Sequence, residues 1–199
     1  MTKKRMMLFF GSFNPVHNGH VNLATECMKL LKLDKMLIVP TAVSPHKQRA
    51  NISYEHRENM CRLAFEGMDK FEICDIETGF SGKSYTINTI RALKQQYPSD
   101  TRFYLIIGGD MLYYFPKWYR YEALLGECQV VAAARENDDY VDMMEFANKI
   151  GRIKVLNLPV VEVSSTDIRQ KLETGENPDG LVPQAVLDYI NEKGLYKHE

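Results

Sequence analysis

Short apolar runs that alternate with amphipathic helical patterns constrain the fold of this 199-residue chain more than any other feature. Brief, continuously apolar runs predict strands buried on both faces, as in parallel sheets. We expect strands at residues 6–10, 36–39, 71–76, 102–107, 129–134 and 152–156. Helical patterns cover residues 21–33, 53–65, 84–97, 140–150 and 183–193, and a further short capped helix is expected in "SSTDIRQKLETG".

This alternation predicts an α/β fold: a doubly wound, mostly parallel Rossmann-like sheet with helices on both faces. We expect residues 1–199 to form a single domain, whose part from about residue 160 carries the short capped helix and a closing helix. In such sheets ligands sit beyond the carboxyl ends of the strands. We therefore expect residues 11–20, 41–47 and 108–110 and the segment before Ser164 to converge there.

Composition excludes some classes of partner and compartment. The formal net charge of −1 offers no basic field to recruit nucleic acid, so any anion site must be local. The four cysteines form no C-x-x-C pair, which favours reduced core thiols over a zinc or redox motif. The apolar run near the N-terminus is soon broken by Gly, Asn and Pro. We therefore expect a cytoplasmic protein without a membrane span.

The segment "GSFNPVHNGH" joins the first strand to the first helix. Gly11 is expected to let the backbone turn tightly after the strand, and Gly19 leaves space for a ligand to approach the backbone. The free N–H groups and positive dipole end of the helix suit phosphate. His17 and His20 could donate to phosphate oxygens there, and preset donors stabilise the charge that builds on a departing pyrophosphate.

Two other interpretations of the histidine pair stay open at this point. His17 and His20 could be part of a metal site, although a zinc site needs at least three ligands and no supporting carboxylate or cysteine lies nearby. The pair could also be purely structural.

The segment "SSTDIRQKL" predicts a second helix start that faces an anion. Ser164 or Ser165 can cap it, Thr166 offers a hydroxyl, and Arg169 can fork two phosphate oxygens. An ordinary capped helix with a solvated arginine is the alternative from these residues alone.

Two signatures together resemble one superfamily. "GSFNPVHNGH" resembles the H-x-G-H signature of the nucleotidylyltransferases, and "VEVSSTDIR" resembles their C-terminal I-S-S-T-x-I-R signature. The resemblance implies that His17 and His20 bind the nucleotide phosphates and stabilise the transition state. It also implies that Ser165, Thr166 and Arg169 bind phosphate.

Three more segments narrow the resemblance to the bacterial nicotinate-nucleotide adenylyltransferases. They are "SPHKQRAN", "SGKSYTINTI" and "GGDMLYYFPKWYRYEALL". The resemblance implies a catalytic set of His17, His20, Lys47 and Arg169. It implies an ATP-binding set of Gly11, Ser12, Phe13, His17, Gly19, His20, Gly108, Asp110, Ser165, Thr166 and Arg169. It implies an acceptor-binding set of Asn14, Lys47, Ser84, Tyr85, Thr86, Trp118 and Tyr119.

The acceptor assignments agree with elementary chemistry. A pyridine ring needs an aromatic face, which Trp118 could provide. An exocyclic carboxylate needs donors, and Ser84, Tyr85 and Thr86 are expected to form a capped helix start that supplies them. The aromatic stretch around Trp118 could instead be a packing cluster or an interaction surface.

The implied reaction joins ATP and nicotinate mononucleotide to give deamido-NAD and pyrophosphate. The attacking phosphate is already an anion, so no general base is required. We expect Mg²⁺ to be held by the ATP phosphates and not by protein side chains. The alternatives are nicotinamide mononucleotide, phosphopantetheine or a phosphoalcohol as the acceptor, and a nucleotide-binding regulatory module without catalysis. A metal-dependent hydrolase lacks candidate ligands.

Overall fold

The computed structural model describes residues 3–43, 52–134, 139–159 and 163–197. The strands there are β1 (Arg5–Gly11), β2 (Lys35–Pro40), β3 (Phe71–Ile73), β4 (Arg102–Gly108), β5 (Gln129–Ala134) and β6 (Ile153–Asn157). The α-helices are α1 (Asn18–Leu30), α2 (Tyr54–Ala64), α3 (Thr86–Gln96), α4 (Gly109–Tyr114), α5 (Tyr121–Glu127), α6 (Tyr140–Ile150), α7 (Ser165–Glu173) and α8 (Gln184–Glu192). Two 3₁₀ helices, η1 (Ile76–Gly79) and η2 (Phe115–Lys117), complete the described elements.

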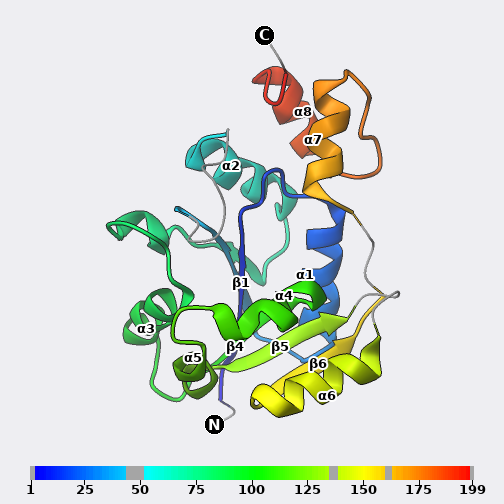
Figure 1. Cartoon of the computed structure of the whole chain (residues 1–199). Helices are drawn as coiled ribbons and strands as arrows, with labels where there is room; N and C mark the ends of the chain where they lie inside the picture. Colours follow the sequence, from blue (N-terminus) through cyan, green and yellow to red (C-terminus); the bar gives the residue numbers. More distant parts are fainter. Residues whose placement is uncertain (1–2, 44–51, 135–138, 160–162, 198–199) are drawn as a thin grey trace.

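The strands form one sheet in the order β3-β2-β1-β4-β5-β6, and every neighbouring pair is parallel (Figure 1). At its centre Leu8 of β1 lies opposite Leu37 of β2 and Leu105 of β4. The chain runs outward from β1 in one direction and from β4 in the other, which is the doubly wound arrangement. The predicted fold class is confirmed.

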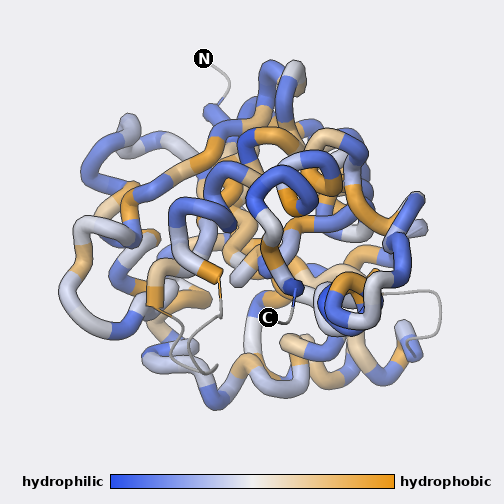
Figure 2. Tube along the Cα trace, turned by 90° about the horizontal axis from the view of Figure 1, so that it is seen from above, coloured by the Kyte–Doolittle hydropathy of each residue, from blue (hydrophilic) through white to orange (hydrophobic). Residues whose placement is uncertain are grey.

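Strand periodicity divides the core into two layers. Met7 and Phe9 of β1 point to the face covered by α1, α2 and α8, and Met6 and Leu8 point to the face covered by α3, α4, α5 and α6. Figure 2 shows the result from above: apolar segments lie mostly inside, and hydrophilic segments run along the outline.

The topological switch point lies between β1 and β4, at the top of the sheet in Figure 1. Gly11 ends β1, which leads into the loop before α1. Gly108 ends β4, and α4 begins at the next residue. Parallel α/β sheets bind their ligands in the crevice at this place. The fold therefore brings residues 11–20 and 108–110 to one edge, as expected.

Several boundaries differ from the sequence prediction. The first helix begins at Asn18 and not at residue 21, β3 ends at Ile73 and is followed by η1, and Pro183 is the N-cap of α8 and lies before its first turn. The helices α4 and α5 were not predicted. They have six and seven residues, too few to establish a clear 3.6-residue period.

The C-terminal segment shares the core of the sheet. Val186 and Ile190 of α8, together with Leu195 and Tyr196, belong to the same buried cluster as Met7 and Phe9. Within the described part of the chain, no helix combines the length and apolarity needed to cross a membrane.

Candidate active site

The two histidines cap α1 reciprocally. His17 is the N-cap, and its Nδ1 accepts a hydrogen bond from the backbone N–H of His20 at 3.3 Å. His20 Nδ1 accepts in turn from the backbone N–H of His17 at 3.2 Å. The two rings stack with their centroids 3.6 Å apart. This is a capping box in which histidines take the places usually held by Ser or Thr and by Glu or Gln.

The reciprocal cap determines the tautomer of both rings. A neutral imidazole whose Nδ1 accepts a hydrogen bond carries its proton on Nε2. We therefore assign the Nε2–H form to His17 and His20. A proton on Nδ1 would face a backbone N–H and break the cap. The arrangement thus makes two neutral donors at the positive end of a helix dipole, where an anionic oxygen is favoured.

Phe13 supports the histidines from within the core. Its φ is +44°, and its ring, only 1% exposed, meets those of Phe9 and His20 edge-on with centroids 5.3 Å and 5.0 Å away. A Cβ on Gly11 would lie 2.9 Å from Phe13 Cζ. The predicted role of Gly11 in a tight turn was therefore wrong. Gly11 completes β1 and leaves space for the Phe13 ring, and the residue with left-handed backbone geometry is Phe13. The Phe13 side chain, predicted to belong to the ATP-binding set, is therefore enclosed in the core.

Side chains of helix α7 bind the backbone carbonyl groups of the loop between β1 and α1. Arg169 Nη1 donates to the carbonyl oxygen of Asn14 at 2.8 Å, and Ser165 Oγ donates to that of Pro15 at 3.0 Å. Arg169 Nη2 also donates to Thr166 Oγ1 at 3.2 Å. The N-cap of α7 is Ser164, whose Oγ accepts from two backbone N–H groups. The structure therefore brings Ser165, Thr166 and Arg169 beside the histidine loop, as the sequence predicted.

Two residues that the sequence analysis missed also hold this loop. Arg57 of α2 is 4% exposed, and its Nη1 donates to the carbonyl oxygen of Ser12 at 2.8 Å. Tyr196, after α8, donates its hydroxyl to Asn14 Oδ1 at 2.6 Å. Burial lowers the pKa of Arg57 and raises the pKa of Tyr196, which keeps the Tyr196 hydroxyl protonated as a donor. The Asn14 side chain, predicted to bind the acceptor, is thus engaged by the C-terminal segment.

The sequence contains a pattern that could have identified Arg57 as a residue of the site, but none that could have identified Tyr196. Arg57 shares the buried stripe of α2 with Met60, Cys61 and Ala64, at spacings of three, four and seven residues. A cation on an apolar stripe is rarely left without a specific partner. Tyr196 lies outside any periodic pattern, so only the tertiary structure shows its contact.

On the acceptor side, two distant segments meet. The rings of Tyr85 and Tyr119 lie 4.5 Å apart, which joins the start of α3 to the segment after η2. Thr86 is the first residue of α3, and the N-cap Tyr85 makes no side-chain capping bond. The first backbone N–H groups of this helix are therefore donors without an intrahelical partner. Trp118 is half-buried, with its ring 5.4 Å from that of Phe115.

Ser84 does not cap α3, which corrects the expected helix start. It is 5% exposed, its Oγ accepts from the backbone N–H of Val43 at 3.2 Å, and its own N–H donates to the Val43 carbonyl at 2.9 Å. The polar groups of Ser84 are bonded to the segment after β2, so they are not available to cap α3. Of the predicted loop at residues 41–51, residues 41–43 are described and lie here, whereas Lys47 lies outside the described residues.

A buried carboxylate completes this junction. Glu77 of η1 is 2% exposed and accepts hydrogen bonds from the backbone N–H of Ala42 at 3.1 Å and from Thr89 Oγ1 at 2.9 Å. Burial raises the pKa of Glu77, and its hydrogen bonds, including one with Ser84, partly oppose that rise. No sequence signal marked this residue.

The remaining predicted residues lie around the same edge. Gly108 is the N-cap of α4, Asp110 lies exposed in its first turn, and Gly19 is buried in the first turn of α1. Within the described ranges no group of three His, Cys, Asp or Glu side chains is placed to hold a metal ion.

Comparison with known proteins defines the class first. The family model described as "Cytidylyltransferase-like" matches residues 8–171, from β1 to α7. Both helix starts at which phosphate-binding residues were predicted lie within this match. The chain therefore belongs to the cytidylyltransferase-like family.

Relatives then identify the branch of the family. A protein of Enterococcus faecalis named probable nicotinate-nucleotide adenylyltransferase is 41% identical over 100% of this chain and 87% of its own length. A protein of the same name from Dehalococcoides mccartyi is 38% identical over 95% of each chain. The resemblance seen in the sequence is confirmed.

A solved structure agrees with the fold. It is that of Plasmodium falciparum nicotinic acid mononucleotide adenylyltransferase complexed with NaAD, with a TM-score of 0.82, 97% coverage of both chains and 19% identity.

Proposed function

We propose that this chain transfers the adenylyl group of ATP to nicotinate mononucleotide, giving deamido-NAD and pyrophosphate for NAD biosynthesis. The observation that carries the proposal is the reciprocal cap of His17 and His20 at the switch point of the sheet. It occurs in a chain that is 41% identical over its whole length to a relative named for this reaction.

The chemistry needs positioning and charge stabilisation more than proton transfer. An oxygen of the acceptor phosphate attacks the α-phosphorus of ATP in line. A new P–O bond forms, the bond to the β-phosphate bridging oxygen breaks, and its electron pair leaves with pyrophosphate. The attacking phosphate is largely deprotonated at neutral pH, because its second pKa is about 6. No general base is therefore assigned.

The histidines stabilise the charge that develops during this displacement. The Nε2–H groups of His17 and His20 donate to phosphate oxygens, and the start of α1 adds backbone N–H groups and its dipole. Both rings act here as hydrogen-bond donors. Mg²⁺ bound to the ATP phosphates would neutralise charge on the triphosphate.

The other phosphate-binding groups come from α7 and from Lys47. Arg169 and Ser165, which hold the loop carbonyls, bind triphosphate oxygens together with Thr166. Lys47 supplies a point charge. The adenosine lies against Gly11, Gly19, Gly108 and Asp110 and the backbone of Ser12 and Phe13.

The nicotinate ring binds between α3 and the segment after η2. Trp118 offers the aromatic face, and the backbone N–H groups at Thr86 and Tyr119 receive the carboxylate. Ser84 acts on this pocket by fixing the start of α3 to Val43.

Within the described residues all four cysteines are free thiols, and we propose that the enzyme works in the reducing cytoplasm.

The test is pyrophosphate release from ATP and Mg²⁺ with nicotinate mononucleotide, nicotinamide mononucleotide or phosphopantetheine as the acceptor. We expect a clear preference for the nicotinate nucleotide. Preference for the amide would keep the mechanism and overturn the carboxylate assignment at Thr86. No release with any acceptor would overturn the proposed function.

A further inference from the structure

The underside of the sheet holds a cavity of about 690 Å³. It is lined by the amino ends of β4 and β5, by residues before and within β6, and by the carboxyl ends of α1 and α5. We call it the basal pocket. The catalytic edge lies at the other end of the same strands, and β4 alone spans about 20 Å from Arg102 to Gly108.

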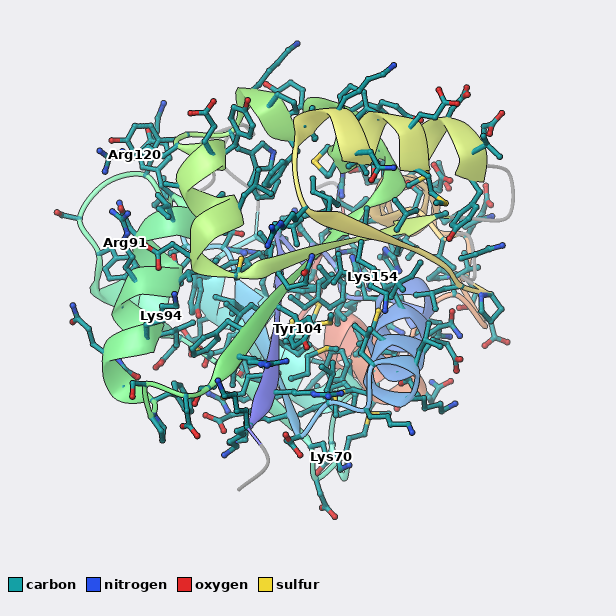
Figure 3. All side chains as sticks on the ribbon, turned by 90° about the horizontal axis from the view of Figure 1, so that it is seen from below. Lys70, Arg91, Lys94, Tyr104, Arg120 and Lys154 are labelled. Carbon is teal, nitrogen blue, oxygen red and sulfur yellow. The ribbon has the colours of Figure 1, made fainter. Side chains whose placement is uncertain are left out.

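The lining of the basal pocket is strongly basic. Figure 3 shows this face from below, with Lys94 and Lys154 on opposite sides of Tyr104. The only carboxylate that lines the pocket is Glu127. The basic residues of the lining are Arg5, Lys32, Lys94, Arg102, Arg152 and Lys154. This set contrasts with a chain whose formal net charge is −1.

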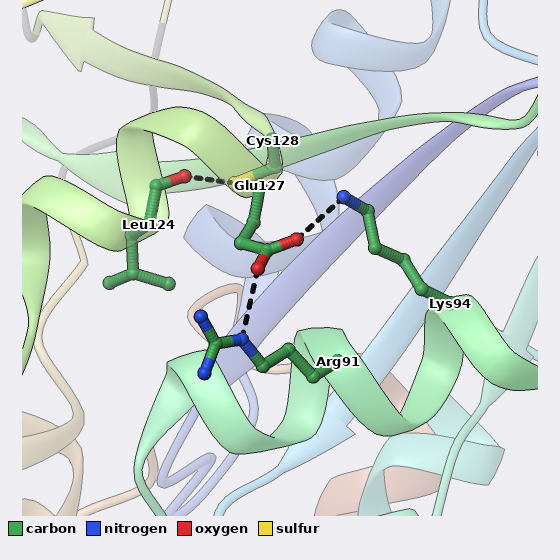
Figure 4. A network of polar contacts seen from close by, with 5 residues as sticks. All are labelled: Arg91, Lys94, Leu124, Glu127 and Cys128. Carbon is green, nitrogen blue, oxygen red and sulfur yellow. Dashed lines mark hydrogen bonds and ion pairs between the residues drawn. The ribbon is translucent and has the colours of Figure 1, made fainter.

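On one side of the pocket, the positive charge of the lining is neutralised by a carboxylate of the same chain. Glu127 accepts from Lys94 Nζ at 2.7 Å and from Arg91 Nε at 2.9 Å, and this network is drawn in Figure 4. In the described parts of the chain, no ion pair joins Lys32, Arg102, Arg152 or Lys154 to a carboxylate. Lys32, Arg102, Arg152 and Lys154 thus line the pocket without an ion-pair partner among the described residues.

Ordinary structural roles explain part of this charge. Lysines favour the carboxyl ends of helices, and a lysine on an edge strand such as β6 discourages strand pairing with another molecule. Arg102 begins β4 and belongs to no final helical turn, whereas Arg152 directly follows Gly151, the C-cap of α6. Helix dipoles therefore explain Arg152 but not the placement of Arg102 and Lys154 on the same cavity.

We propose that the basal pocket binds a small anion carrying two or more phosphate groups, at a site separate from the catalytic edge. Its volume falls in the range of small-molecule sites, about 300–1,000 Å³. Arginine forks and lysine point charges together suit clustered phosphate oxygens. A concave pocket in a chain with a formal net charge of −1 favours a compact polyanion over an extended nucleic acid.

The experiment is calorimetric titration with inorganic tripolyphosphate, repeated on a chain with His20→Ala and Arg169→Ala, which removes two proposed phosphate contacts of the nucleotide site. We expect one tripolyphosphate per chain to bind at a site that this double variant retains. Lys154→Glu should weaken it roughly tenfold, the loss of one charge-assisted contact, and Arg102→Glu with Lys154→Glu should abolish it. The control is Lys70→Glu, an equal charge change at an exposed lysine outside the pocket lining, labelled in Figure 3, which should bind like the wild type.

Circular dichroism identifies any variant that fails to fold, and Lys154→Gln with Arg102→Gln then replaces the charge reversals. Equal binding by the wild type and the pocket variants would overturn the proposal, as would absence of binding. Binding of a DNA duplex in preference to tripolyphosphate would also overturn it. Pyrophosphate release without tripolyphosphate should be unchanged in Lys154→Glu. An inactive wild type that still binds tripolyphosphate would contradict the proposed function alone.

Discussion

Among single residues, His17 is notable because it is the N-cap of α1, a position where histidine is not a preferred residue. Ser, Thr, Asp and Asn are the usual N-caps. A hydroxyl or carboxylate there would satisfy the helix equally well, but it would not provide an imidazole N–H donor. The local cost of an unusual cap is therefore consistent with a binding role for the ring.

The first prediction concerns this donor pair. His20→Ala should lower turnover by roughly 100-fold to 1,000-fold, because it removes a donor that acts on developing charge. It should cost only about 1 kcal/mol of folding free energy, because one half of a capping box is lost. Steady-state pyrophosphate release and urea unfolding measure the two effects.

The matched control is His56→Ala, which removes a histidine bonded to Tyr189 between α2 and α8. It should change stability and leave turnover near that of the wild type. Near-normal turnover in His20→Ala would contradict the catalytic assignment.

The second prediction concerns pH and the buried Glu77. Its folded-state pKa is raised above the ordinary value of 4.5, mainly by burial. The protonated form therefore stabilises the fold, and that stability is lost as pH rises through the raised pKa. Relative to Glu77→Gln, the wild type should become progressively less stable as the pH rises above the ordinary pKa of 4.5.

Urea unfolding of both proteins across this pH range provides the measurement for Glu77. Glu145→Gln, at an exposed position of α6, is the control and should track the wild type. A constant difference between the wild type and Glu77→Gln at all pH values would refute the argument.

At the scale of elements, the loop between β1 and α1 is held by its neighbours. Helix α2 binds its first part through Arg57, and α7 binds its second part through Arg169 and Ser165. Three carbonyl oxygens are thereby satisfied by side chains from elements far away in the sequence. Because the loop orients the start of α1, these contacts set the direction of the histidine donors.

The third prediction tests Arg57 as a positioning residue. Arg57→Met should lower kcat by about tenfold or more, since small displacements of catalytic groups reduce rates steeply. The KM for ATP should change less, because other phosphate contacts remain. Arg57→Lys should recover part of kcat by donating to the Ser12 carbonyl.

Steady-state kinetics at 25 °C, with folding verified by circular dichroism, measures these effects of Arg57. Loss of stability with an unchanged kcat would show that Arg57 serves only the fold.

At the scale of the whole molecule, the C-terminal helices share a core with the sheet. Leu195 and Tyr196 pack in the cluster of Met7 and Phe9, and Asn18 donates its backbone N–H to the Leu181 carbonyl at 2.9 Å. We propose on this basis that residues 1–199 fold as one unit.

The fourth prediction follows from that shared core. Thermal unfolding should show a single transition, with coincident near- and far-ultraviolet circular dichroism and equal calorimetric and van't Hoff enthalpies. Tyr196→Phe should lower the midpoint without splitting the transition. Two separate transitions would assign the C-terminal part to an independent domain.

Local sequence patterns predicted the doubly wound fold class and the edge of the sheet at which residues 11–20 and 108–110 meet. These features depend on hydrophobic period and on short local motifs, which act over a few residues. The exact limits of Gln129–Ala134 and Tyr140–Ile150 were predicted for the same reason.

Only the tertiary structure decided how the side chains at that edge are engaged. The reciprocal histidine cap depends on α1 beginning at Asn18, and the reason for Gly11 depends on where the Phe13 ring packs. Arg57, Glu77 and Tyr196 reach the site through contacts across large sequence separations. Burial and long-range hydrogen bonds have no local period, so a single sequence carries little trace of them.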